Sequence, residues 1–140
     1  MIRLTVELPK TNTFVLPEGL ELNDRKTELY LRCSPQSRLL LAGAYFDSSE
    51  CHQILTWLKL LSQDHARKED MVKIRMICNN TRLYADNMVL NGLHFKECIL
   101  QNVMMARIDF NSCIFEDCSF SGCELAHTRF IACPFMHGIS

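Results

Sequence analysis

The fold of this chain is decided by the stretch from Leu90 to Phe135, which reads LNGLHFKECILQNVMMARIDFNSCIFEDCSFSGCELAHTRFIACPF. Every fifth residue of this stretch is a leucine, a phenylalanine or a methionine. These residues are Leu90, Phe95, Leu100, Met105, Phe110, Phe115, Phe120, Leu125, Phe130 and Phe135. A second column lies two residues before the first, and all its members except Thr128 are apolar or cysteine. They are Met88, Leu93, Cys98, Val103, Ile108, Cys113, Cys118, Cys123, Thr128 and Cys133.

A period of five residues matches neither an α-helix, which repeats every 3.6 residues, nor a flat strand, which repeats every two. It requires a backbone that turns a corner every five residues while both columns face one axis. Four such sides close a square coil of about twenty residues, and coils stack about 4.8 Å apart. Residues twenty apart are therefore predicted to form ladders. The ladders are Phe95–Phe115–Phe135, Leu90–Phe110–Phe130, Leu100–Phe120 and Met105–Leu125.

This pattern resembles the pentapeptide-repeat family, whose members form a right-handed quadrilateral β-helix. The central Leu or Phe of the family matches the first column, over residues 83–137. The small residue two places earlier is usually Ala in the family and is mostly Cys here, where a free Cys packs as a small hydrophobe. The resemblance implies that residues 81–140 form such a β-helix with an incomplete third coil.

Residues 1–80 are predicted to form a small α+β module. Alternation of Ile2, Leu4 and Val6 with polar residues indicates a half-buried strand, and turn-like stretches divide the region up to residue 46 into an antiparallel meander. A short partner strand is expected at 13–16 and a longer strand at 38–46.

Apolar residues at helical spacing predict a helix at about 48–63, with Asp47 and Glu50 as its capping box. An apolar run predicts a strand at about 71–78. The fold class is therefore mainly β, with the α+β module leading into the β-helix. Because no flexible linker separates the two parts, we expect one rigid body in which the helix or the last strand covers the first coil.

Composition and cysteine spacing narrow the functional classes. The formal net charge of -1 provides no polycation, so no nucleic-acid partner is expected. No run of 18 apolar residues could span a membrane, and the N-terminus carries no hydrophobic signal segment. Five of the eight cysteines fall in the second column, where we expect packed, reduced thiols in preference to disulfides or a metal site. Cys98 should lie over Cys118, and Cys113 over Cys133.

No enzyme is expected, because the sequence lacks the GxSxG, P-loop, GxGxxG and HExxH motifs, and neither a cofactor nor a metal is expected. His94 and His127 fall at outward positions of the repeat and are predicted to be solvated, as is the Glu116-Asp117 pair. Apolar residues at outward positions form the candidate protein-interaction surface. They are Ile99, Met104, Ile114 and Ile131. The alternative for Ile99 and Met104 is that the N-terminal module covers them.

A second resemblance concerns the order of the parts. The order of the parts resembles that of the PipB-like type III secretion effectors of enteric bacteria. It consists of a strand-rich stretch, a helix with the Leu-rich run 54–62, a charged connector, a short strand and then the pentapeptides. The resemblance implies a non-enzymatic virulence protein, made in the bacterial cytoplasm and injected into host cells, where it binds a host protein or a membrane-associated factor. These effectors carry a longer N-terminal region with the secretion signal, so this chain is either a fragment or a short relative.

Two other functions remain open. Pentapeptide proteins that mimic DNA and protect DNA gyrase need long acidic coils, whereas residues 82–129 hold an excess of only two acidic over basic side chains. The third hypothesis is that the protein is a structural adaptor inside the bacterium. Separately, a β-helix coil exposes its core and its backbone edge unless something covers it. We therefore expect the end near Phe130 and Phe135 to meet further repeats, a second copy in an end-to-end homodimer, or another partner.

Overall fold

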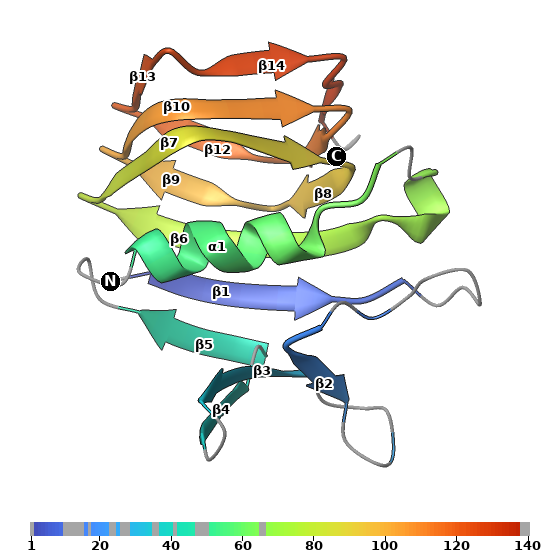
Figure 1. Ribbon diagram of the computed structural model, residues 1–140. Helices are drawn as coiled ribbons and strands as arrows, with labels where there is room; N and C mark the ends of the chain where they lie inside the picture. The colour runs from blue at the N-terminus through green and yellow to red at the C-terminus, as the bar shows by residue number, and fades with distance from the viewer. Residues whose placement is uncertain are drawn as a thin grey trace.

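A computed structural model describes residues 2–9, 16, 18–22, 25, 29–34, 37–40, 42–46, 51–64 and 67–137. The described chain is mainly β, and residues 72–136 form a β-solenoid of about three coils. Its strands are β6 (Val72–Asn79), β7 (Arg82–Asn91), β8 (Leu93–Lys96), β9 (Ile99–Gln101), β10 (Met104–Asn111), β11 (Ile114–Glu116), β12 (Ser119–Ser121), β13 (Glu124–Ala126), β14 (Arg129–Ile131) and β15 (Phe135–Met136). Figure 1 shows the coils stacked, with β13 and β14 at the top.

Each solenoid strand pairs in parallel with a strand one coil away. β8 pairs with β11 and β11 with β15 on one side, and β9 pairs with β12 on the next. The long strand β10 pairs with β7 below it, and with β13 and β14 above it. The predicted stacking of coils is therefore confirmed, with hydrogen bonds running along the solenoid axis.

The predicted ladders are confirmed in register. Phe115 pairs with Phe95 below it and with Phe135 above it, and the rings stack with centroids 5.0 Å and 4.9 Å apart. The Phe110 and Phe130 rings stack in the same way at 5.1 Å. The remaining predicted partners, Leu90–Phe110, Leu100–Phe120 and Met105–Leu125, are also paired. The five-residue column therefore forms the inner wall of the solenoid.

The corners of the coils share one backbone conformation. From Asn87 to Ala132, every fifth residue has a positive φ, between 50° and 64°. These residues are Asn87, Gly92, Glu97, Asn102, Arg107, Ser112, Asp117, Gly122, His127 and Ala132. Only two of them are glycine, although the left-handed region costs other residues roughly 1–2 kcal/mol. Packing of the ladders therefore holds the corners in place against the local backbone preference.

The solenoid begins earlier than predicted, at Val72 instead of residue 81. β6 pairs in parallel with β8 through Ile74 and Phe95, and with β9 through Cys78 and Leu100. The pairing between β7 and β10 shifts register between Ala106 and Ile108, so the first coil is longer than twenty residues. This lengthened coil breaks the five-residue period, which explains why the sequence pattern placed the strand outside the β-helix.

The N-terminal strands are β1 (Ile2–Glu7), β2 (Leu20–Leu22), β3 (Leu29–Ser34), β4 (Ser37–Leu40) and β5 (Ala42–Phe46). β2, β3 and β4 form an antiparallel meander. β2 was not predicted, and the prediction of a single strand at 38–46 is wrong, because β4 pairs with β3 whereas β5 pairs with β1. β1 does not join that meander: it pairs antiparallel with β5 and with β6, so it extends a sheet of the solenoid. The partner strand predicted at 13–16 lies outside the described residues, except for Leu16, which is not in a strand.

The helix α1 (Cys51–Leu61) ends at Leu61, before the predicted end at about residue 63. The predicted start at about 48 and the proposed capping residues at 47 and 50 lie outside the described residues. A short 3₁₀ helix, η2 (Lys68–Asp70), precedes β6. Leu55 and Leu58 of α1 are buried and belong to the same hydrophobic cluster as the inner wall of the solenoid. The Lys59 ammonium donates to the Val89 carbonyl of β7 at 2.6 Å. As expected, the helix covers the first coil (Figure 1).

Candidate functional site

The four residues of the predicted interaction surface do not form one patch. Ile99 in β9 and Ile131 in β14 are 40% and 43% exposed, and Met104 in β10 is half-buried. Ile114 in β11 is only 7% exposed, so the prediction that it faces water is wrong. Each of the four lies on a different strand. Ile99 pairs with Ser119, Ile131 with Asn111, Met104 with Arg82 and Ile114 with His94. The three that reach the surface, Ile99, Met104 and Ile131, therefore lie on three different strands.

A more continuous apolar surface lies at the C-terminal end of the solenoid. We call it the solenoid end and define it by Phe120, Leu125, Phe130 and Phe135. Phe120 is 38% exposed, Leu125 49% and Phe135 53%, although all belong to the inward column. Their ladder partners one coil below, Leu100, Met105 and Phe115, are at most 4% exposed. The inward side chains are exposed because no further coil of the described chain lies above them.

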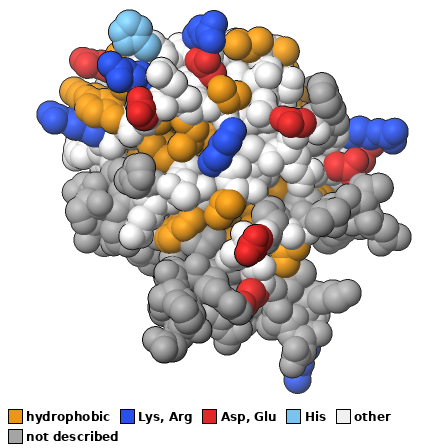
Figure 2. All heavy atoms as spheres, in the orientation of Figure 1, with side chains coloured by type: hydrophobic (Ala, Val, Ile, Leu, Met, Phe, Trp, Pro, Cys, Tyr) orange, Lys and Arg blue, Asp and Glu red, His pale blue; other side chains and the backbone are white. Residues whose placement is uncertain are grey.

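The backbone at the solenoid end is also open. Among the described residues, β12, β13, β14 and β15 are the last strands of their pairing paths. Each therefore has one edge without a strand partner in the described chain, which makes it a template for another strand. In Figure 2 hydrophobic side chains reach the surface at this upper end of the molecule, between charged groups.

His94 departs from the prediction of a solvated histidine, because its side chain is only 2% exposed. It lies on β8 in register with Lys73 of β6 and Ile114 of β11. Its Nε2 atom is 3.3 Å from a carboxylate oxygen of Glu116, and neither ring nitrogen makes a well-aligned hydrogen bond. Burial lowers the pKa of His94, and the Glu116 carboxylate partly opposes this effect.

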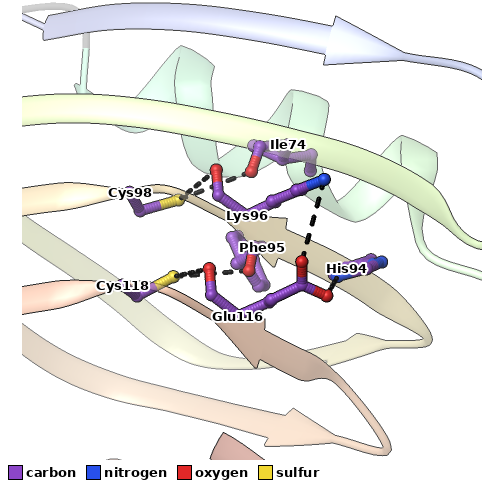
Figure 3. A network of polar contacts seen from close by, with 7 residues as sticks. All are labelled: Ile74, His94, Phe95, Lys96, Cys98, Glu116 and Cys118. Carbon is purple, nitrogen blue, oxygen red and sulfur yellow. Dashed lines mark hydrogen bonds and ion pairs between the residues drawn. The ribbon is translucent and has the colours of Figure 1, made fainter. Parts of the chain in front are cut away.

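Glu116 is likewise not the solvated side chain that the sequence suggested. Its side chain is 20% exposed, and its second oxygen is 3.7 Å from the Lys96 ammonium. Figure 3 shows Glu116 between His94 and Lys96. These groups line a cleft of about 550 Å³, together with the end of β1 and η2. The cleft presents three lysines and three glutamates, so its charge does not select a ligand of either sign.

The cysteine column has a repeated hydrogen-bonding role that the sequence did not reveal. Each thiol donates to the carbonyl of an inward residue in the coil below, at 3.2–3.5 Å. The pairs are Cys98 with Ile74, Cys113 with Leu90, Cys118 with Phe95, Cys123 with Leu100 and Cys133 with Phe110. These five thiols are free, as predicted. Cys98 and Cys113 are buried, and the other three are half-buried.

No three His, Cys, Asp or Glu side chains of the described chain gather as a metal-ligand set. No helix within the described ranges has the length and apolar character needed to cross a membrane. The interior of the solenoid holds an apolar cavity of only about 20 Å³, bounded by α1 and the inward column. An apolar space of this size offers a water molecule no polar partners.

Comparison with protein-family models, with curated proteins and with solved structures finds no match to this chain.

Proposed function

We propose that this chain is a non-enzymatic protein-binding module that works through the surface of its β-solenoid. The observation that carries the proposal is the exposure of 38–53% for Phe120, Leu125 and Phe135 at the solenoid end. Large apolar side chains that are gathered at an open sheet edge are typical of interaction sites. Ile99 and Ile131 add separate exposed apolar side chains on the solenoid sides.

We further propose that the solenoid is a right-handed quadrilateral β-helix of the pentapeptide-repeat type. Support comes from the five-residue period of both the inward column and the positive-φ corners. The register of twenty residues between ladder partners in the second and third coils agrees with four five-residue sides per coil. An experimental structure at a resolution that traces the backbone tests the handedness.

The biological setting that we propose rests on the resemblance to PipB-like effectors. In this proposal the protein is made in the bacterial cytoplasm, passes through a type III secretion system, and binds a host protein or a membrane-associated factor. A reporter fused to the chain should reach host cells from an enteric bacterium with a working injection apparatus. An isogenic strain without the apparatus is the control, and equal delivery from both strains would contradict the proposal.

A Leu125→Glu variant tests the binding surface in the same assay. The substitution places a charge at the solenoid end, where Leu125 is 49% exposed, and delivery should be unchanged because the other ladders of the solenoid remain intact. Cross-linking of the wild-type chain to its host protein should be lost in the variant. Unchanged cross-linking by the variant would show that the solenoid end is not the binding surface.

A second copy of the chain is the partner that we propose for the isolated protein. The opposite end of the solenoid is covered by α1, which packs on β7, so copies cannot stack head to tail without displacing the helix. Two solenoid ends can meet about a two-fold axis, because such an interface is self-complementary. The resulting end-to-end homodimer would bury the inward column of both copies.

The alternative of gyrase binding by DNA mimicry finds less support in the charge arrangement. Arg129 donates two hydrogen bonds to the Asp109 carboxylate, at 2.6 Å and 3.1 Å, and Glu116 lies beside Lys96. Pairing of acidic with basic side chains weakens any likeness to a phosphate duplex. A gyrase supercoiling assay decides, because protection or inhibition would favour this alternative. A structural adaptor inside the bacterium would neither protect nor inhibit gyrase, and it would not be delivered into host cells.

A further inference from the structure

Three buried residues lie apart from the main hydrophobic core. Met71 and Ile114 are each 7% exposed, but neither belongs to the cluster that fills the solenoid. His94 on β8 pairs with Ile114 of β11, lines a cleft together with Met71, and is 2% exposed. Both ring nitrogens of His94 are buried, and neither has a hydrogen-bond partner among the described residues. Because a buried polar atom without a partner destabilises a fold, the structure holds this imidazole at a cost in free energy.

One border of the cleft at His94 is formed by residues 67–71, which we call the strap. The strap contains η2, a short 3₁₀ helix with no buried residue. The Met71 amide donates to the Lys68 carbonyl at 3.3 Å, so this hydrogen bond lies within the strap. Met71 is the only buried residue of the strap. Opening of the strap therefore exposes one apolar side chain and breaks no strand pairing, which makes it a local opening of low cost.

Another border of the cleft is formed by the end of β1 and is held more firmly. Glu7 pairs with Lys73 of β6, and Leu8 packs against the main hydrophobic core. Movement of this border would break strand pairing and core packing. The strap is therefore the part of the border that opens most easily.

Charged side chains from five elements line the cleft with His94. They are Glu7 of β1, Lys68 and Glu69 of η2, Lys73 of β6, Lys96 of β8 and Glu116 of β11. One oxygen of Glu116 is 3.3 Å from Nε2 of His94, and the other is 3.7 Å from the Lys96 ammonium (Figure 3). Burial lowers the pKa of His94, and the Glu116 carboxylate partly opposes this effect. The ammonium groups of Lys73 and Lys68 lower that pKa further. A proton added to the closed structure would therefore produce a buried imidazolium whose nearest carboxylate is shared with Lys96.

We propose that His94 and the strap form a pH-sensitive switch, in which protonation of the imidazole releases the strap and opens the cleft while the coils of the solenoid stay paired. In the closed state the imidazole is neutral and Met71 is buried. In the open state water solvates the imidazolium, and the Met71 side chain becomes exposed. Since a solvated histidine has a pKa of about 6.5, a fall in pH below that value favours the open state. The switch is independent of the proposed binding at the solenoid end.

Hydrogen exchange of the intact chain at pH 7 and pH 5.5 tests the switch, with each amide rate corrected for its intrinsic rate at that pH. The Met71 amide reports on the strap through its hydrogen bond to the Lys68 carbonyl. Acidification should lower the protection of this amide several-fold, up to about tenfold, because a solvated imidazole is about tenfold more often protonated than neutral at pH 5.5. Protection that is unchanged or increased at pH 5.5 would overturn the proposal.

Low concentrations of urea separate opening of the strap from global unfolding, which exposes far more surface. The Ser119 amide on β12, which donates to the Cys98 carbonyl at 2.8 Å, reports on the solenoid. Urea should accelerate exchange at Ser119 and leave the Met71 rate unchanged. If urea accelerates both amides equally, His94 is protonated only in the unfolded chain and the switch does not exist.

An NMR titration of the His94 ring in variants tests the charges of the cleft. Glu116→Gln removes the nearest anion and should lower the midpoint, whereas Lys68→Gln removes a cation of the strap and should raise it. Glu124→Gln is the matched control, because Glu124 is exposed on β13 and does not line the cleft. His94→Phe should make the protection of Met71 equal at both pH values, and circular dichroism checks that this variant folds. A wild-type midpoint at or above about 6.5 would show that the closed site accepts the imidazolium, which contradicts the switch.

Discussion

Phe115 shows how a single side chain holds the solenoid together. It is only 4% exposed, and its ring stacks between Phe95 and Phe135. The Phe110 and Phe130 rings meet it edge-on, with centroids 5.4 Å and 5.5 Å away. Aromatic pairs in these geometries contribute roughly 0.5–1.5 kcal/mol beyond the burial of their area. Phe115 therefore links two ladders as well as adjacent coils.

Phe115→Ala should accordingly be among the most damaging substitutions, with a loss of about 3–5 kcal/mol in the free energy of unfolding. Ser119→Ala is the control, because Ser119 is exposed on β12 and its side chain does not enter the core. The control should change stability by less than about 0.5 kcal/mol. Urea melts measure both variants, and equal midpoints would contradict the inward assignment of Phe115.

His94 makes stability depend on pH. Burial lowers the pKa of the folded-state imidazole, whereas the unfolded chain has the ordinary histidine value of about 6.5. The unfolded state therefore binds more protons as the pH falls below that value. The stability contributed by neutral His94 should be fully present well above pH 6.5 and should decline as the pH falls from about 6.5 through the lower folded-state pKa. Protonation of the His94 imidazole therefore favours the unfolded state.

Urea melts between pH 7 and pH 5 check this prediction, because carboxylates titrate mainly below that range. His94→Phe removes the titrating group and should flatten the decline. The matched control is His127→Asn, since His127 is exposed and asparagine tolerates its positive φ of 50°. A decline in His94→Phe as steep as that of the wild type would assign the pH dependence to another group.

The inward residues could be predicted from the sequence because each contributes to a period that repeats ten times between Leu90 and Phe135. The burial of His94 and Ile114 could not be predicted from the sequence, because the outward positions of the repeat show no periodic pattern of residue types. His94 is enclosed by segments distant in sequence, namely the end of β1 and η2. The thiol-to-carbonyl hydrogen bonds were likewise hidden, because the column pattern shows only that a cysteine is small and apolar.

Among the elements, the corners depend most on the surrounding structure. Gly122 has a φ of 64°, and a Cβ atom there would clash with the side-chain oxygen of Asn102. Ala132 occupies the equivalent corner position at a φ of 51°. A residue with a Cβ atom is disfavoured in this region by roughly 1–2 kcal/mol relative to glycine.

The two corners therefore give opposite predictions. Gly122→Ala should lower the free energy of unfolding by at least about 1 kcal/mol, whereas Ala132→Gly should raise it by up to about 1 kcal/mol. Thermal or urea melts of the two variants measure both changes. Two variants of equal stability would mean that the left-handed corner conformation costs nothing in this fold.

The strand β6 is an element that the sequence pattern predicted only in part. Its buried residues alternate with period two, so the strand was predicted but its membership of the solenoid was not. Membership follows only from its pairing with β8 and β9, which the longer first coil brings into register. An irregular coil cannot be recognised from a period that it breaks.

For the whole molecule, the two ends of the solenoid differ. At one end, Leu55 and Leu58 of α1 close the first coil and are each 2% exposed. At the other, the solenoid end leaves Leu125 and Phe135 about half exposed. The solenoid end therefore offers an open sheet edge together with exposed inward side chains in the described chain.

We expect the isolated chain to form a dimer through the solenoid end, because burying the exposed inward column of both copies removes apolar surface from water. Light scattering over a dilution series should show the mass of two chains, 16.2 kDa each, at high concentration and a shift toward one chain on dilution. Leu125→Glu should weaken the dimer at least about a hundredfold, since an unpaired charge would be buried in each copy.

Tyr84→Glu is the matched control for this experiment. Tyr84 is 51% exposed, close to the 49% of Leu125, and it lies on β7 in the first coil, with β10 between it and β13. Tyr84 lines the same lateral cleft as Leu125, but it does not belong to the inward column that forms the solenoid end. The control should dimerise as the wild type does, because its new charge stays in water. If both variants weaken association equally, the interface lies elsewhere. If the wild-type chain is monomeric at every concentration, the solenoid end does not bind a second copy.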